Sequence, residues 1–395
     1  MVSVSLSKVF CGSSTLKTLW VTLTALAVVG VFSLYESNVL PVVTIFEVIL
    51  IVLSLLFISK LSLLGVVFSL FSFLYILFSS ALALYYDVNY LDFIQAYKAF
   101  FYVLVLLPFF GKNIFHSDFV RFLYITILLL FLTKYSYSIA FNFTDRMGSR
   151  PGLFAENNFE LVFLAFLYYF ATLDNIKYKN IFFALFALVV IMSGSRSGLG
   201  ILLVSFYFSY FRFNLLGIIT SSIGLLILFG FVLYFFMVRT DGQFYNIDRF
   251  KFLSIWLYET SSWEWWRYLI GNASLTPLSS ESCSTLSYWS SLFSFSGDGS
   301  CYSVILHSYI LRVVFDHGVL GLVFLLAFSA CGVLISGLKF RSVLFVWGVL
   351  LASALSVSSF NSVFSAISLA IAFGYYSKSG DSSVFFRKSA LKSPA

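Results

Sequence analysis

Long, nearly unbroken runs of apolar residues dominate the chain. They lack both the alternation of a half-buried strand and the spaced stripe of a soluble amphipathic helix. A membrane-spanning helix needs about 20 mainly apolar residues. About twelve stretches meet this requirement, with centres near residues 27, 49, 71, 102, 131, 166, 187, 205, 226, 328, 350 and 370. The pattern predicts an all-α polytopic membrane protein with about twelve transmembrane helices.

Composition supports this prediction. The 395 residues are 60% hydrophobic and 10% charged, whereas soluble domains carry about 25% charged residues. The chain holds 50 Phe and no period-two alternation, which argues against a transmembrane barrel. The first apolar run, residues 18–35, follows Lys8 and Lys17 but no small-residue cleavage site follows it. We therefore expect it to be retained as the first span rather than removed as a signal peptide.

The cations indicate an orientation. A formal charge of +7 would suggest nucleic acid for a soluble protein, but here it reflects which side of the bilayer each loop occupies, and no nucleic-acid partner is expected. With both termini cytoplasmic, most cations fall in inner loops and tails. These are Lys8, Lys17, Lys60, Lys112, Arg121, Lys177, Lys179, Arg212, Lys339, Arg341, Lys378, Arg387, Lys388 and Lys392.

The cations assigned to the outer side differ in kind, because nearly all of them are arginine. They are Arg146, Arg150, Arg196, Arg239, Arg249, Lys251, Arg267 and Arg312. The planar guanidinium grips phosphate in a bidentate manner, whereas topology alone needs no particular cation. The outer face is therefore predicted to hold phosphate.

One transmembrane domain covers residues 1–395, and only two outer segments are long. The first is residues 142–158, in which a Pro-Gly pair marks a turn. The second, residues 239–307, is large enough for a small subdomain with short helices. It begins with a predicted amphipathic helix at 246–258 and continues into a Ser-rich segment at 274–300.

Trp263, Trp265 and Trp266 cluster within this large loop. Such residues gather at membrane interfaces, and they also stack on sugar rings; the sequence leaves both interpretations open. Cys283 and Cys301 bracket the Ser-rich segment, where an oxidising periplasm would favour a disulfide over two free thiols. Closing a loop of this size stabilises a fold by roughly 3 kcal/mol.

Arg196 lies in Ser-Gly-Ser-Arg-Ser-Gly (193–198), which interrupts an apolar stretch from about 181 to 211. A cation at membrane depth is a functional-site hypothesis by default. The backbone N–H groups of the helix that begins here would face the same anion as the guanidinium. The structural alternative is that Arg196 caps a neighbouring helix or pairs with Glu156.

His307 stands after the large loop, at the outer end of the tenth predicted span. An imidazole at that interface could remove a proton from a hydroxyl, although a single histidine is more often a hydrogen-bonding surface residue. Glu259 and Asp298 are alternative bases on the same side. The chain has neither a D-x-D pair nor an H-E-x-x-H motif, so we expect no metal site.

Three segments together resemble the O-antigen polymerase and O-antigen ligase superfamily, a group of bacterial GT-C-like glycosyltransferases. These are the SGSRSG motif, the loop that opens with Asp248-Arg249 and continues through Trp256 to Gly271, and LHSYILRVVFDHGVLGL at 306–322. The resemblance covers about residues 146–322 and rests on the order and spacing of the motifs. It implies donors in which the glycan is linked to undecaprenyl diphosphate.

The resemblance implies roles for individual residues. Arg196 and Arg249 match the arginines expected to bind the diphosphate, and His307 matches the catalytic histidine that precedes a Gly-x-x-Gly turn. Ser308 departs from the asparagine common at that position, which leaves the partner of His307 open. The secondary candidates for the second diphosphate or the acceptor glycan are Arg146, Arg150 and Arg312.

These features together predict a surface-polysaccharide polymerase of the bacterial inner membrane with a periplasmic site. It would transfer the growing glycan to the next lipid-linked repeat unit without metal or cofactor, with a chain-length regulator as a further partner. A ligase that moves the polymer to lipid A core is the nearest alternative. A secondary transporter is the second; its charges would lie within the spans, where Lys98, Lys134, Glu47 and Glu160 are the candidates.

Overall fold

The computed structural model describes residues 14–33, 39–58, 61–141, 152–174, 178–211, 248–272 and 274–376, with separate positions between 217 and 230. It is mostly helical (78%). The strands β1 (Phe115–His116) and β2 (Tyr375–Tyr376) pair in parallel, with Phe115 opposite Tyr375. The predicted all-α character is confirmed.

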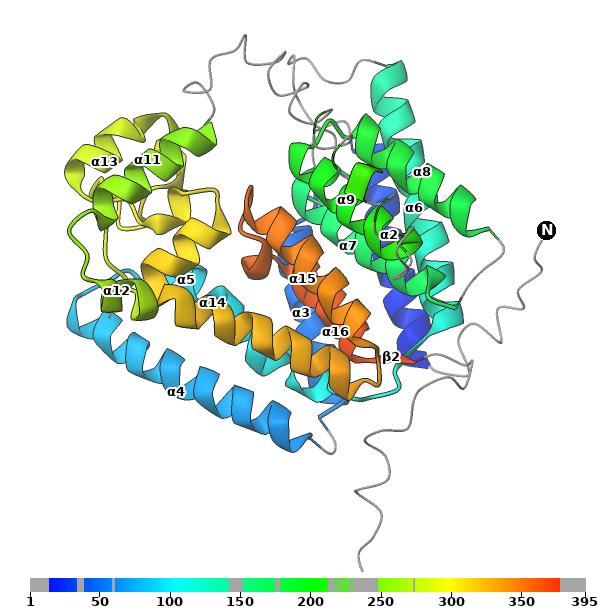
Figure 1. The fold of residues 1–395 in the computed structure, drawn as a ribbon, viewed down its shortest axis with the longest axis horizontal. Coiled ribbons are helices and arrows are strands. Elements are labelled where there is room, and N and C mark those ends of the chain that lie inside the picture. Colours follow the sequence, from blue (N-terminus) through cyan, green and yellow to red (C-terminus); the bar gives the residue numbers. More distant parts are fainter. Residues whose placement is uncertain are drawn as a thin grey trace, which may run out of the picture.

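Along the sequence, the described helices lie before and after the large loop, and the colours of Figure 1 follow this order. Before the loop lie α2 (Ser14–Phe32), α3 (Val42–Leu56), α4 (Leu63–Tyr85), α5 (Tyr90–Leu106), η1 (Leu107–Phe109), α6 (Ser117–Ala140), α7 (Asn157–Thr172), α8 (Lys179–Met192) and α9 (Arg196–Tyr210). After it lie α14 (Tyr309–Ile335), α15 (Phe340–Ala354), η5 (Ser359–Asn361) and α16 (Val363–Phe373).

Five of the described helical segments are long and apolar enough to cross a membrane. They are Ser14–Phe32, Leu63–Tyr85, Tyr90–Phe109, Ser117–Ala140 and Tyr309–Ile335. Four shorter apolar helices, α3, α8, α15 and α16, have 11 to 15 residues. At 1.5 Å per residue they reach about 17 to 23 Å, less than the hydrocarbon core of about 30 Å. The helices indicate a membrane protein, but they support the predicted twelve spans only in part.

Small polar residues shorten these helices. The helix α8 ends at Ser193, and Gly194 follows with φ 59°, a conformation that glycine adopts without strain. The segment between α15 and α16 contains four serines, and its chain turns through the short helix η5. Serine competes for backbone hydrogen bonds and glycine lacks a side chain to pack, so an apolar run can be longer than the helix within it.

The centre of the bundle is α7, in which every residue except the partly buried Phe159 is buried. It contacts α6, α8, α9, α15 and α16. In contrast, α4 packs mainly on α5 and exposes Leu70, Phe71, Leu74, Leu77 and Phe78 along one face. A stripe of exposed large apolar side chains at helical spacing suits a lipid-facing helix.

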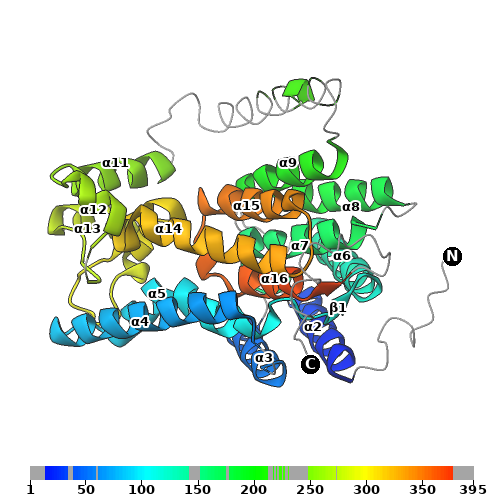
Figure 2. The same ribbon diagram turned by 60° about the horizontal axis from the view of Figure 1, so that its bottom comes forward.

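The large loop folds into a subdomain with its own core, which we call the loop subdomain (residues 248–307). It contains α11 (Asp248–Thr260), α12 (Trp265–Ile270), α13 (Ser280–Thr285), η3 (Ser287–Leu292) and η4 (Ser303–Ile305). Its buried residues include Phe252, Ile255, Leu278, Leu286 and Leu306. Figures 1 and 2 show this subdomain at one end of the molecule, beside the start of α14.

A close contact between two glycines joins the loop subdomain to α14. Gly318 has φ 69° and ψ 178°, which breaks α14 into two helical segments. A Cβ at Gly318 would lie 2.1 Å from the carbonyl oxygen of Leu269, and one at Gly271 would lie 2.5 Å from the Gly318 nitrogen. Beside them, both the backbone and side-chain amides of Asn272 donate to the Phe315 carbonyl at 3.1 Å. We call this contact the glycine joint.

We expect Gly318→Ala to destabilise the protein strongly. The required φ and ψ values alone cost about 1–3 kcal/mol, and the clash with Leu269 adds to that cost. Gly337→Ala is a matched control, because Gly337 has φ 78° but open space around it. Thermal unfolding in lipid nanodiscs should show a larger loss for Gly318→Ala. Equal losses would mean that the glycine joint is not closely packed.

Candidate functional site

Arg196 is the first residue of α9, where the sequence predicts a helix to begin. The Ser195 side chain caps that helix by accepting a hydrogen bond from the Gly198 backbone at 3.0 Å. The guanidinium is half-buried. The residue therefore stands at a helix N-terminus, in the position that the phosphate-binding hypothesis requires.

Asn157 and Asn158, at the start of α7, hold the SGSRSG segment in place. Oδ1 of Asn158 accepts hydrogen bonds from the hydroxyls of Ser195 (2.6 Å) and Ser197 (3.0 Å). Nδ2 of Asn157 donates to the Ser193 carbonyl at 3.1 Å. Two adjacent asparagines at the head of an apolar helix are the sequence signal for this role, which the sequence analysis did not assign.

Glu160 is fully buried one turn further along α7. Its carboxylate accepts hydrogen bonds from the backbone amides of Leu153 (2.8 Å), Phe154 (2.8 Å) and Ala155 (2.5 Å). A buried carboxylate that receives several N–H bonds has its charge compensated locally. Glu160 therefore fixes the short segment that leads to Glu156, whose side chain is exposed.

His307 is half-buried, and its ring meets that of Phe252 edge-on with centroids 5.5 Å apart. Burial lowers the pKa of His307 below its usual value. Among the nearby charges, that of Glu156 raises this pKa most and that of Arg249 lowers it most, with smaller effects from Asp248 and Arg312. The imidazole is thus biased toward its neutral form, which can accept a proton.

Arg249 lies in the first turn of α11 and reaches across to the membrane helices. Its guanidinium donates a hydrogen bond to the hydroxyl of Ser356, in the turn that follows α15. Asn158 also donates to Glu156 Oε1 at 3.1 Å. The structure therefore brings Arg249 and Glu156 each within electrostatic reach of His307, while Asn158 links Glu156 to the segment that carries Arg196.

Ser308 does not orient the imidazole. Its hydroxyl donates to the Ala354 carbonyl at 3.3 Å, on the neighbouring helix α15. Among the described residues, no hydrogen bond involves the His307 side chain. Among the neighbouring charges, that of Glu156 has the largest effect on the pKa of the His307 ring.

The placement of Arg312 requires a correction. The sequence analysis put it on the outer face as a secondary substrate-binding residue, but its side chain is buried. It donates to the Gln95 carbonyl at 2.5 Å and to the Ser358 hydroxyl at 3.3 Å, and its Nε lies 3.9 Å from Asp316. A buried guanidinium needs such partners, and these contacts tie α14 to α5 and η5.

Arg146 and Arg150, the other secondary candidates, lie outside the described residues. The two carboxylates considered as alternative bases are held within the loop subdomain. Glu259 accepts from the Ser279 backbone at 3.0 Å, and Asp298 accepts from the Ser300 backbone at 2.8 Å. Neither contact points to proton transfer.

A second polar cluster lies buried beside the glycine joint. The Ser303 hydroxyl donates to Asp316 at 2.5 Å, and the Tyr75 hydroxyl hydrogen-bonds Nδ1 of His317 at 2.8 Å. The sequence analysis assigned His317 no role, although ionisable residues in an apolar run were the available signal. The aromatic rings of Tyr75, Tyr97 and Phe100 surround His317, which suits a structural role.

Cys283 and Cys301 form a disulfide, as the sequence predicts. The backbone amide of Leu278 donates to the Cys301 carbonyl at 2.8 Å, so the bridge lies in the core of the loop subdomain. The covalent bond closes a segment with a sequence separation of 18 residues.

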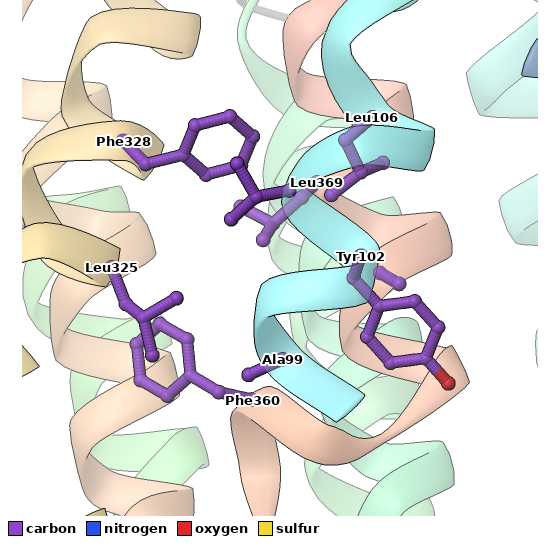
Figure 3. Close-up of a pocket in the computed structure, with 9 residues that line it drawn as sticks. Ala99, Tyr102, Leu106, Leu325, Phe328, Phe360 and Leu369 are labelled. Atoms are coloured by element: carbon purple, nitrogen blue, oxygen red, sulfur yellow. The ribbon is translucent and has the colours of Figure 1, made fainter. Parts of the chain in front are cut away.

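A small cavity lies between α5, α14 and α16, away from these charges (Figure 3). Its volume is about 10 Å³, which is room for one water molecule. The lining is apolar apart from the edge of Tyr102, and includes Ala99, Leu325, Phe328 and Leu369. It has neither the size nor the charge to hold a diphosphate.

Across the part of the chain that the structure describes, no three His, Cys, Asp or Glu side chains come together in a way that would hold a metal ion. Comparison of the chain with models of protein families, with curated proteins and with solved structures finds no match. The candidate site therefore rests on its own residues and on the motif resemblance.

We expect Asn158→Ala to destabilise the protein by about 1–3 kcal/mol, because the buried hydroxyls of Ser195 and Ser197 lose their acceptor. Asn180→Ala is the matched control. Asn180 accepts only from the exposed Tyr210 hydroxyl, so its loss should cost less than about 0.5 kcal/mol. Thermal unfolding of both variants measures the difference, and a small effect for both would count against the proposed anchoring of the SGSRSG segment.

Proposed function

We propose that this chain is an O-antigen polymerase. It transfers a growing glycan from undecaprenyl diphosphate to the next lipid-linked repeat unit on the periplasmic side of a bacterial inner membrane. The observation that carries the proposal is the convergence of His307 and Arg249 at the end of an apolar helix bundle. The SGSRSG segment is linked to the same place through Asn158 and Glu156.

The proposed reaction begins with the donor diphosphate held by Arg196 and Arg249. His307 takes the proton of the acceptor hydroxyl, and the freed oxygen bonds to the anomeric carbon of the donor sugar. The bond from that carbon to the phosphate oxygen breaks, and its electron pair leaves with undecaprenyl diphosphate. The guanidinium groups stabilise the charge that develops on the leaving group, so they can serve where other enzymes use a metal.

Glu156 has a defined part in this scheme. Removal of the acceptor proton leaves an imidazolium, and a nearby carboxylate stabilises that cation. The hydrogen bonds of Glu160 to the preceding segment hold Glu156 near the ring. Glu156 is therefore a positioning residue that acts through His307.

A ligase that moves the finished polymer to lipid A core uses the same donor and the same chemistry. The phenotype of a deletion strain separates the two. Core that carries one repeat unit indicates a polymerase, whereas bare core with polymer left on the lipid carrier indicates a ligase.

A transporter is less well supported, because the charges within the helices are engaged. Lys98 pairs with Glu47, and the Lys134 ammonium donates to the Ser33 carbonyl at 2.6 Å. Glu160 receives three backbone amides. Glycan movement by the purified protein in liposomes, without bond formation, would favour transport.

We expect His307→Ala, Arg249→Lys and Arg196→Lys to abolish or strongly shorten the polysaccharide ladder at normal protein levels. The lysine variants keep the charge but lose the bidentate grip. Arg121→Lys is the matched control, since Arg121 pairs with Asp118 at the start of α6, away from the proposed site. Gel profiles of the surface glycan measure the result, and full ladders in the three site variants would remove the proposed site.

The lowered pKa of His307 predicts a pH profile. The imidazole must be neutral to accept a proton, so activity should persist below the usual histidine pKa of about 6.5 and fall only at lower pH. The Glu156 charge raises this pKa, so Glu156→Gln should move the acid limb of kcat/KM to lower pH. Transfer between purified lipid-linked glycans measures the shift, and movement to higher pH would contradict the assigned pairing.

A further inference from the structure

The short helix α12, with sequence WWRYLI, turns its apolar side chains away from the protein. Trp265 is 75% exposed and Ile270 is 50% exposed, with Trp266 and Leu269 also exposed. These four residues occur at i, i+1, i+4 and i+5, so they lie on one side of the helix. We call them the α12 face.

The other two residues of α12, Arg267 and Tyr268, and the nearby Trp263 point inward. Arg267 donates to Asn272 Oδ1 at 2.6 Å and lies 5.0 Å from the centroid of the Trp263 ring. The Tyr268 hydroxyl donates to the Thr260 carbonyl at 2.9 Å. Trp263 stacks on Phe315 with ring centroids 5.4 Å apart. Within α12 the polar groups thus face the protein and the apolar groups face outward, the reverse of a water-exposed helix. Glu264, just before α12, is exposed and accepts a hydrogen bond from the Trp266 indole at 2.5 Å.

The α12 face continues an apolar surface of the membrane helices. The glycine joint fixes the end of α12 against the kink of α14. The residues immediately after the kink, Val319, Leu320 and Val323, are exposed on α14. Figures 1 and 2 show α12 beside α14, at the same end of the molecule as the turn from α4 to α5.

That turn carries a second group of exposed aromatics. Tyr85 and Tyr86 end α4, Tyr90 begins α5, and all three are exposed. Tyrosine and tryptophan gather where a bilayer meets water, because their rings are apolar while their N–H or O–H groups bind water and headgroups. The α12 face and these three tyrosines lie at the same end of the bundle, so both indicate the same boundary between bilayer and water.

We propose that α12 is an interfacial helix, with Trp265, Trp266, Leu269 and Ile270 inserted between the lipid headgroups and the acyl chains. The occupant of the α12 face is the bilayer itself. A sugar-binding surface would pair its aromatic rings with hydrogen-bonding side chains, but Leu269 and Ile270 offer none. The inference depends on the membrane character of the helices and is independent of the proposed glycosyl transfer.

This assignment separates the roles of the clustered tryptophans. Trp263 belongs to the interior of the loop subdomain, whereas Trp265 and Trp266 belong to the lipid boundary. Lipid contact at α12 would be transmitted through the glycine joint to α14. The position of the membrane surface then determines how far the loop subdomain, and with it His307, lies from the bilayer.

Spin labels can test the proposal in protein reconstituted in phosphatidylethanolamine and phosphatidylglycerol nanodiscs. The background carries Cys11→Ser and Cys331→Ser, and it keeps the Cys283 to Cys301 disulfide. Single labels are placed through Trp265→Cys and Leu269→Cys. Tyr288→Cys is the matched control, since Tyr288 is an aromatic residue of the same subdomain and is 86% exposed.

Power saturation then compares collisions with oxygen, which partitions into lipid, and with a water-soluble nickel chelate. We expect labels at 265 and 269 to have an oxygen-to-nickel ratio several-fold higher than the label at 288. A ratio at 265 and 269 as low as at 288 would place α12 in water and overturn the proposal. Low access to both reagents would indicate a protein partner instead, and would overturn it equally.

Discussion

The glycine joint is the contact on which the arrangement of the candidate site depends. Two backbones approach so closely at Gly271 and Gly318 that no side chain fits on either residue. The break in α14 frees backbone carbonyls, and Asn272 satisfies that of Phe315 with two donors. The chain on both sides of this contact carries the functional candidates, since His307 precedes α14 and Arg249 lies in α11. A rigid junction is the physical condition for holding an imidazole and a guanidinium in one geometry.

The segments that carry Arg196 and Glu156 are held by polar side chains that are buried and hydrogen-bonded. Asn158, at the start of α7, accepts hydrogen bonds from the serines at the start of α9. Glu160 accepts hydrogen bonds from three backbone amides of the segment before α7. Polar atoms in an apolar bundle are costly unless they are hydrogen-bonded. Any other arrangement would leave some of these buried polar atoms without a hydrogen bond, so the network favours the arrangement of the segment that is seen here. Local networks of this kind hold the segments that carry Arg196 and Glu156.

The sequence predicted features that depend on local pattern. Apolar runs gave the helices, the helix start at Arg196 followed from the small residues before it, and the spacing of Cys283 and Cys301 suggested their bond. The sequence did not reveal features that depend on packing between distant parts of the chain. The buried Arg312 and an outer-loop arginine look the same in a sequence, because the difference lies in Gln95 and Ser358, which are distant along the chain. Helix lengths were overestimated for the same reason, since composition does not reveal where a backbone turns.

The buried position of α7 constrains how the protein is made. Nearly all of its residues are buried, and two of its neighbours, α15 and α16, begin at residues 340 and 363. During synthesis the ribosome releases α7 long before either of these helices exists. The newly inserted α7 must therefore remain beside lipid, or beside the insertion machinery, until the last part of the chain arrives. The strand β2, which pairs with β1, directly follows α16, so truncation before residue 363 would leave one side of α7 uncovered.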